Sequence, residues 1–242
     1  MRKPEKSIVS KLYKQGILQD TSILCVCAGD AEQRLFGELG IKNVTLSNIS
    51  ELSITNPTYK FSKQNAMNLT FENESFDYVF VSNGLHHCSS PHRALLEMYR
   101  VAKKGIVVIE NKDSLLMRIA IKLNLTVNYE GIEEITKQGW GGYNNSCIPN
   151  YIYRWTEREF KKTICSYYPI GHHDFRFFYG LDIPERTNGL IATIIKVAMF
   201  IFPKSKNVFC ATITKPEVSG SIFPWIKNIP NYKDIINDFH TQ

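Results

Sequence analysis

The chain has 242 residues, of which 43% are apolar, so it is long enough to bury one sizeable core and favours one main domain. Its net charge of +6 comes from scattered Lys and Arg without a long basic run, which argues against nucleic acid as a partner and suits an anionic substrate. The six cysteines form neither a Cys-x-x-Cys pair nor a zinc-type Cys-His spacing, so no metal site is expected. Residues 1–7 run into no apolar signal core, and the sequence therefore predicts a protein of the reducing cytoplasm.

The first half of the chain alternates apolar, strand-like runs with helical patterns. The runs at 78–81 and 106–109 are apolar without alternation, as expected for parallel strands that helices cover on both faces. Ser90 and Pro91 begin a helix that links two adjacent strands and stops near Gly105. The pattern predicts an α/β fold with a doubly wound, mostly parallel sheet. Its first five strands are expected at 22–27, 43–47, 59–62, 76–82 and 105–110.

The second half carries a different pattern. Residues 114–127 are predicted to be helical, and the glycine-rich, aromatic segment 139–145 is predicted to form a loop that acts as a substrate lid. A capping box at Thr156 opens a short helix to about Tyr167. A late strand is expected at 207–214, and the proline-bearing segment 216–242 is expected to be a surface extension.

The longest apolar stretch, residues 190–202, is interrupted by Lys196. It is shorter than the ~20 residues that a membrane span requires. We expect a buried helix that ends before Pro203. The alternative is a surface that touches a membrane and serves a lipid-linked substrate, without a transmembrane segment.

Four segments in order carry a resemblance to a known family. An apolar strand is followed by Cys27-Ala28-Gly29-Asp30 and a helix; residues 65–77 then read Asn-Ala-Met-Asn-Leu-Thr-Phe-Glu-Asn-Glu-Ser-Phe-Asp. Leu85-His86-His87 and residues 100–105, Arg-Val-Ala-Lys-Lys-Gly, follow at the family's spacing. Residues from about 20 to 112, and more weakly 205–215, resemble class I S-adenosylmethionine-dependent methyltransferases of the methyltransferase 11 type.

The resemblance implies a Rossmann-like, seven-stranded, mostly parallel sheet with a reversed last strand. On this basis residues 1–215 form a single methyltransferase domain. It comprises a cofactor half, 1–112, a helical and loop insertion on the substrate side, about 113–204, and the last strand, 207–214. Residues 216–242 form the C-terminal extension.

The resemblance also implies S-adenosyl-L-methionine as the cofactor. In place of the family's several glycines the first turn keeps one, Gly29, and Asn48 and Asn65 replace the two carboxylates that contact ribose and adenine. An amide can still hydrogen-bond a hydroxyl or an exocyclic amine. The implied cofactor residues are, along the chain, Cys27, Ala28, Gly29, Asp30, Asn48, Ile49, Asn65, Ala66, Met67 and Asn83.

His86 and His87 follow the fourth strand, and either is a candidate general base, with a structural or cofactor-shaping role as the alternative. His172 and His173 are a second pair that could face the acceptor. Methyl transfer needs a base only to deprotonate the acceptor.

Aromatic and basic residues of the second half favour O-methylation of a sugar or a sugar-containing intermediate, as in polysaccharide biosynthesis. Trp140 and Tyr143 suit stacking on a sugar. The nearby cations suit a phosphate or a carboxylate; they are Arg154, Arg158, Lys161 and Lys162.

Other acceptors and other functions stay open. A lipid or quinone precursor and a protein side chain are further acceptors, and a degenerate, non-catalytic nucleotide-binding or interaction domain is the alternative to an enzyme. A nicotinamide dehydrogenase is disfavoured because the chain lacks Gly-x-Gly-x-x-Gly.

Overall fold

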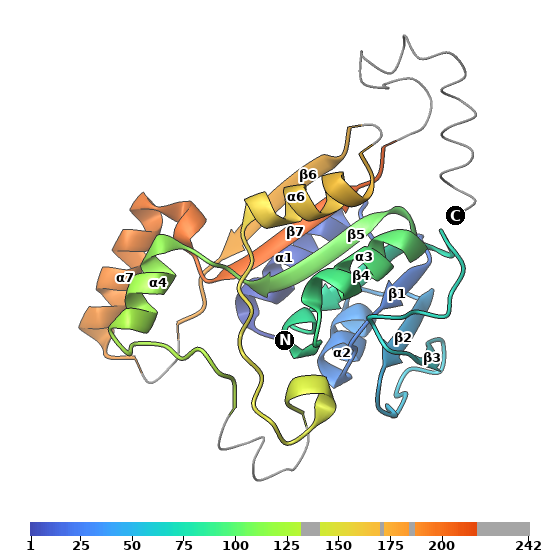
Figure 1. Ribbon diagram of the computed structural model, residues 1–242, viewed down its shortest axis with the longest axis horizontal. Helices are drawn as coiled ribbons and strands as arrows, with labels where there is room; N and C mark the ends of the chain where they lie inside the picture. Colours follow the sequence, from blue (N-terminus) through green and yellow to red (C-terminus); the bar gives the residue numbers. More distant parts are fainter. Residues whose placement is uncertain (132–140, 170–171, 184–186, 217–242) are drawn as a thin grey trace.

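The computed structural model describes residues 1–131, 141–169, 172–183 and 187–216. Seven strands form one sheet in the order β3-β2-β1-β4-β5-β7-β6 (Figure 1). The strands are β1 Ile23–Cys25, β2 Val44–Asn48, β3 Lys60–Lys63, β4 Phe76–Ser82, β5 Ala102–Asn111, β6 Asp174–Gly180 and β7 Val208–Thr214.

Strand direction confirms the predicted topology. β1 to β5 pair in parallel, whereas β7 pairs antiparallel with both of its neighbours, β5 and β6. The last strand is therefore reversed inside a mostly parallel sheet. Because the carboxyl ends of parallel strands meet at one edge, residues that follow β1, β2 and β4 converge there.

The helices begin where the sequence offers capping groups. The Ser90 hydroxyl accepts a hydrogen bond from the Arg93 N–H at the start of α3, and Thr156 with Glu159 forms the predicted capping box of α6. The helices are α1 Lys3–Lys14, α2 Asp30–Glu38, α3 Pro91–Val101, α4 Leu115–Lys122, α6 Glu157–Tyr167 and α7 Gly189–Ile201, with 3₁₀ turns η1 Leu85–His87, η2 Tyr143–Asn145 and η3 Pro203–Ser205.

The core lies on both faces of the sheet. Alternate strand residues point to opposite faces, so Leu24 joins a cluster with α3 and α6, while Ile23 joins a cluster with α1 and α2. The ring of Trp155 stacks on that of Phe160 in the first cluster, with centroids 4.6 Å apart. Helices cover both faces, as the doubly wound prediction requires.

The structure contradicts the prediction that residues 190–202 form a buried helix. Helix α7 ends before Pro203 as expected, yet it contributes no buried residue, and neither does α4, which is shorter than the predicted 114–127. The two helices lie together beyond the end of the sheet, outside the helical layers (Figure 1). A helix that is apolar all round carries no sequence signal for which side is covered, so only the tertiary arrangement decides its burial. No described helix is long and apolar enough to cross a membrane.

Two glycines provide a test of the packing between β5 and β7. A Cβ atom at Gly105 would lie 2.5 Å from the Ile213 carbonyl oxygen, whereas one at Gly37, inside α2, would meet nothing within 4 Å. We expect Gly105→Ala to lower the free energy of unfolding by about 2 kcal/mol or more, because the backbone of β7 must shift. Gly37→Ala should raise it by about 0.5–1 kcal/mol through helix propensity. Urea unfolding of both variants measures the difference, and equal stabilities would contradict the packing of β5 on β7.

Candidate active site

A cavity of about 250 Å³ opens at the carboxyl edge of the sheet. It lies between the ends of β1, β2 and β4 and the loop that contains η2. Small and uncharged polar residues dominate its wall, which suits a ligand that approaches the backbone closely. The lining residues are Cys27, Asn48, Ile49, Gln64, Asn65, Ala66, Met67, Asn83, Gly84, His87, Cys88, Gly141, Gly142 and Asn144.

Most of the predicted cofactor residues line this cavity, and the structure places three of them elsewhere. Ala28 is fully buried in the core, and the Gly29 N–H donates to Glu32 Oε2 at 2.9 Å. Asp30 is exposed at the first position of α2. The predicted residues that do line the cavity are Cys27, Asn48, Ile49, Asn65, Ala66, Met67 and Asn83.

The two asparagines that replace the family's carboxylates shape the backbone around the cavity. Asn48 Nδ2 donates to the Ala28 carbonyl at 2.8 Å, and Asn48 Oδ1 accepts from the Ser50 N–H at 3.2 Å. Asn65 Oδ1 accepts from the Met67 N–H at 3.0 Å. Each amide fixes a turn of the wall, and Asn48 does so partly as a donor, which a carboxylate cannot be.

Gly84, rather than Gly29, is the glycine that a close approach requires. A Cβ atom at Gly84 would lie 2.5 Å from Cys27 Cβ and 2.9 Å from Val81 Cγ2, whereas one at Gly29 would meet only Glu32 Oε2 at 3.5 Å. The turns after β1 and β4 therefore contact each other directly at the floor of the cavity. Any side chain at position 84 would displace Cys27.

The N-terminal helix reaches the cavity wall through Asn83, a connection that no sequence pattern predicts. Arg2 Nη2 donates to Asn83 Oδ1 at 2.7 Å, and Asn83 Nδ2 donates to Glu5 Oε1 at 2.8 Å. Asn83 has a φ of 51°, a left-handed conformation that Asn tolerates better than most residues. The side chain of Asn83 thus joins α1 to the turn after β4.

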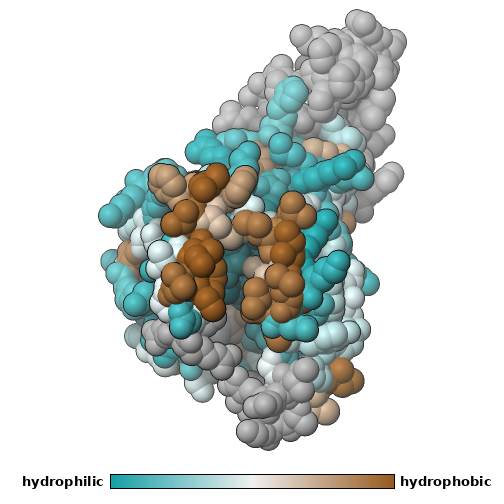
Figure 2. Space-filling model, turned by 90° about the vertical axis from the view of Figure 1, so that its left-hand side faces the viewer, coloured by the Kyte–Doolittle hydropathy of each residue, from teal (hydrophilic) through white to brown (hydrophobic). Residues whose placement is uncertain are grey.

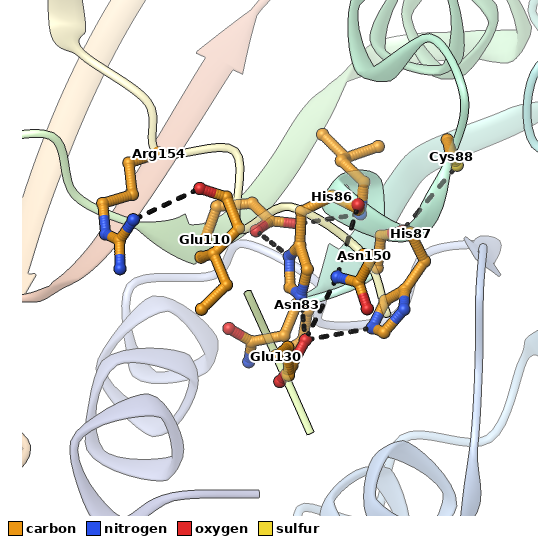
Figure 3. A network of polar contacts seen from close by, with 12 residues as sticks. Asn83, His86, His87, Cys88, Glu110, Glu130, Asn150 and Arg154 are labelled. Atoms are coloured by element: carbon orange, nitrogen blue, oxygen red, sulfur yellow. Dashed lines mark hydrogen bonds and ion pairs between the residues drawn. The ribbon is translucent and has the colours of Figure 1, made fainter. Parts of the chain in front are cut away.

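His86 is held between two carboxylates (Figure 3). Its Nδ1 lies 2.7 Å from Glu110 Oε2, and its Nε2 lies 2.8 Å from Glu130 Oε2. Burial by itself lowers the pKa of His86, but the two carboxylates outweigh burial and raise this pKa to about 10. His86 is therefore an imidazolium at neutral pH, donates from both nitrogens, and cannot accept a proton. Of its two predicted roles, the structural one fits.

His87 lies in a different environment. It is half-buried, it lines the cavity, and its Nε2 lies 3.6 Å from Glu130 Oε2. Burial and the positive charge of His86 lower the pKa of His87 below its ordinary value. His87 is therefore neutral at pH 7 and can accept a proton. The Glu130 carboxylate, whose pKa the hydrogen bond from His86 lowers to about 2, stays charged beside it.

Three residues of this network were not predicted. Glu110 is fully buried at the end of β5 and also accepts from the Leu85 N–H at 2.7 Å. Asn150 Nδ2 donates to Glu130 Oε2 at 3.3 Å. A carboxylate that ends an apolar strand is a signal that could have found Glu110. Glu130 and Asn150 lie in segments without periodicity, and no pattern singles them out.

His86, His87 and Glu130 each offer an atom within 4.8 Å of the other two, so they could surround a metal ion. The hydrogen bonds of His86 already satisfy both ring nitrogens. A metal would require His86 to be neutral, whereas the two carboxylates keep it protonated. The cluster is accounted for by hydrogen bonding alone.

None of the described aromatic and basic residues expected to bind the acceptor lines the cavity. Trp140 lies outside the described residues, while Tyr143 is exposed in η2, next to the cavity residues Gly142 and Asn144. The Arg154 guanidinium turns to the Val127 carbonyl, at 2.6 Å, and Lys161 lies over rings of β6. His173 bonds the Tyr99 hydroxyl, away from the cavity.

Comparisons with known proteins agree with the fold. A family described as "Methyltransferase domain" matches residues 25–109. The search of curated proteins found no significant match.

Among solved structures, the YcgJ protein of Bacillus subtilis is 12% identical, with a TM-score of 0.54 over 88% of this chain and 99% of that one. A SAM-dependent methyltransferase of Archaeoglobus fulgidus is 13% identical, with a TM-score of 0.51 over 87% and 94%. The 1,6-didemethyltoxoflavin-N1-methyltransferase of Burkholderia thailandensis, solved with S-adenosylhomocysteine, is 14% identical, with a TM-score of 0.50 over 89% and 78%. These likenesses show a shared fold.

Replacement of His86 tests its charge. Because the pKa of His86 rises from about 6.5 in the unfolded chain to about 10 in the folded protein, its stabilising contribution is complete below pH 6.5. That contribution is lost as the pH rises through 10. We expect His86→Gln to lower the free energy of unfolding by about 3 kcal/mol at pH 6, since it leaves Glu110 buried without a cation. The deficit should narrow toward pH 10.

Denaturant unfolding at several pH values measures this deficit. His92 of α3, whose half-exposed ring packs on Trp155, supplies the control. Because His92 does not compensate a buried carboxylate, the deficit of His92→Gln should be smaller than that of His86→Gln and should not narrow toward pH 10. A deficit of His86→Gln that does not depend on pH would contradict the protonated state of His86.

A pair of glycine substitutions tests the floor of the cavity. Gly84→Ala should weaken binding of S-adenosylhomocysteine about tenfold or more, because the added Cβ displaces Cys27. Gly29→Ala is the matched control and should bind with nearly wild-type affinity. Calorimetric titration measures both, with a melting curve to establish that each variant folds. Loss of binding in Gly29→Ala with retention in Gly84→Ala would show that the ligand lies elsewhere.

Proposed function

We propose that the chain, a class I S-adenosylmethionine-dependent methyltransferase, methylates a hydroxyl of a small molecule with His87 as the general base. One observation carries the choice of base: of the two adjacent histidines, only His87 lines the cavity with a lowered pKa. His86, fixed as a cation, cannot take this role.

The residues present fit the cofactor. The cavity lies where open α/β sheets bind nucleotides, and Gly84, Ala66 and the turn at Cys27 keep side chains out of it. Asn65 and Asn48 lie on the wall that the resemblance assigns to adenine and ribose, and Asn83 closes the pocket. When bound, S-adenosylmethionine supplies an electrophilic methyl group on a sulfonium.

His87 and Glu130 act on the proton of the acceptor hydroxyl. His87 takes the proton of the acceptor hydroxyl as the new oxygen–carbon bond forms, and Glu130, 3.6 Å from Nε2, stabilises the resulting imidazolium. S-adenosylhomocysteine is the other product. His86 assists indirectly, because its positive charge keeps His87 neutral beforehand.

The wall of the cavity supports an uncharged acceptor. Among the described residues that line it, none is Asp, Glu, Lys or Arg. Amide side chains such as Gln64 and Asn144 both donate and accept hydrogen bonds, as hydroxyl groups do, and Tyr143 beside them offers a ring for stacking. A sugar or a sugar-containing intermediate, as in polysaccharide biosynthesis, is therefore the first class of acceptor that we propose.

We further propose that the enzyme works in the cytoplasm. All six cysteines are free thiols, and Cys25 and Cys210 are buried in the core, where burial raises the pKa of each thiol. A chain that keeps its thiols unpaired is typical of a reducing compartment.

Replacement of His87 tests the proposal. Transfer of labelled methyl groups to a panel of sugars, phenols and amines identifies an acceptor. With that acceptor, His87→Ala should lower kcat about a hundredfold or more, because the hydroxyl loses its base. Affinity for S-adenosylhomocysteine should stay near the wild-type value.

The pH profile separates a base from a structural residue. Because the pKa of His87 is lowered, the wild-type rate should be flat near neutrality and fall only as the pH drops below about 6.5, the ordinary pKa of His. His87→Ala should lose this acid limb, and His92→Ala should keep it. Full activity of His87→Ala would refute the base, and absence of cofactor binding in the wild type would refute the pocket.

A further inference from the structure

The two helices α4 and α7 expose an unusual number of apolar side chains. They lie side by side at one end of the molecule, and neither contributes a buried residue. Figure 2 faces this end and shows two apolar bands with a hollow between them. We call this the α4–α7 surface; its exposed apolar residues are Leu115, Ile119, Leu123, Leu125, Val127, Leu190, Ile191, Ile194, Val197, Phe200, Ile201 and Phe202.

The fold does not account for this composition. Phe200 is 87% exposed, and Leu115, Leu125 and Leu190 are each at least 70% exposed. Contiguous apolar surface of this kind is rare on a soluble protein and marks a docking site for a partner or a membrane. The exposed apolar residues come from two helices that are far apart in the sequence and lie together in the structure.

The segments that form the α4–α7 surface carry charges of one sign, and the bordering carboxylates Asp113 and Asp182 pair with Arg118 and Arg2. Residues 114–129 and 187–215 contain no Asp or Glu. They do contain exposed Lys122, Lys196 and Lys204, and also Arg118, which binds Asp113. Cations that border an apolar surface complement the anionic headgroups of a lipid bilayer.

We propose that the α4–α7 surface docks on an anionic membrane surface. Its apolar side chains enter the boundary between headgroups and acyl chains, and its lysines remain at the level of the headgroups. Helix α7 has 13 residues, about 20 Å of helix, so it lies in the interface and does not span. The proposal does not depend on the acceptor or on the catalytic base.

A second copy of the chain is a poorer occupant of the same surface. A twofold dimer brings identical patches together, so the lysines of one copy would face those of the other. The segments that form the surface hold no acidic residue to pair with them. Lipid headgroups supply the missing negative charge.

The α4–α7 surface adjoins the candidate active site along the chain. From α4 the chain continues through Val127, whose carbonyl accepts from Arg154, to Glu130, whose carboxylate binds His86. Helix α7 leads through η3 into β7. Both helices therefore attach at the carboxyl edge of the parallel strands, the edge at which the cavity opens.

Flotation with vesicles tests the docking. We expect the full chain to float with vesicles of phosphatidylglycerol and phosphatidylcholine, and to bind vesicles of phosphatidylcholine alone much less. The double variant Ile194→Gln/Phe200→Gln should lose about tenfold or more in partitioning, because two exposed apolar groups leave the interface. Gln keeps helix propensity high. The matched control is Ile148→Gln, which replaces a 58% exposed apolar residue outside the surface and should bind as the wild type does.

The charge contribution is tested separately. Lys122→Glu/Lys204→Glu should weaken binding to anionic vesicles about tenfold, whereas Lys42→Glu, at the amino end of β2, should not. About 0.5 M salt should weaken the wild type in the same way. Failure of the wild type to float, or unchanged binding by Ile194→Gln/Phe200→Gln, overturns the proposal.

Light scattering without lipid tests whether a second copy of the chain binds the α4–α7 surface instead. A wild-type dimer that Ile194→Gln/Phe200→Gln dissociates would assign the surface to self-association and overturn the membrane proposal. A wild type that stays monomeric and floats supports it. Calorimetric binding of S-adenosylhomocysteine should be equal in all of these variants, so a failed pocket and a failed docking surface are distinguishable.

Discussion

The pairing of the buried His86 with the buried Glu110 and the half-exposed Glu130 is the interaction on which the site depends. Glu110 is fully buried at the end of β5, and a carboxylate there is tolerable only with a cation and hydrogen bonds in reach. His86 supplies the cation and reaches outward to Glu130, which ties the segment that follows α4 to the turn after β4. The same positive charge lowers the pKa of His87. One imidazolium between two carboxylates thus ties the segment around Glu130 to the sheet and sets the protonation state of the neighbouring residue.

The cavity is built by backbone contacts as much as by side chains. Gly84 lets the turn after β4 touch the turn at Cys27, and Asn48 and Asn65 tie their own loops. Amides rather than charged side chains hold this wall in place. Arg2 extends this wall from the other end of the chain through Asn83.

The same carboxyl edge of the sheet also carries the α4–α7 surface. Core packing selects apolar residues for strands and layer helices, but it does not require Phe200 or Leu115, which no other element covers. Their position beside exposed lysines, in segments that contain no acidic residue, is the reason to connect this end of the molecule with a lipid interface.

The sequence by itself determined six of the seven strands, the doubly wound sheet and the edge at which the cavity lies, because apolar runs and capping boxes are local patterns that report burial directly. It also placed Asn83 and His87 after β4. It missed β6, which lies inside the predicted helical and loop insertion. Only the tertiary structure decided that His86 is a cation and His87 neutral, since Glu110 and Glu130 are 24 and 44 residues away from His86. It likewise decided that α7 is exposed and that Gly84 rather than Gly29 is sterically required. Electrostatics and close contacts depend on distances in space, which no local pattern records.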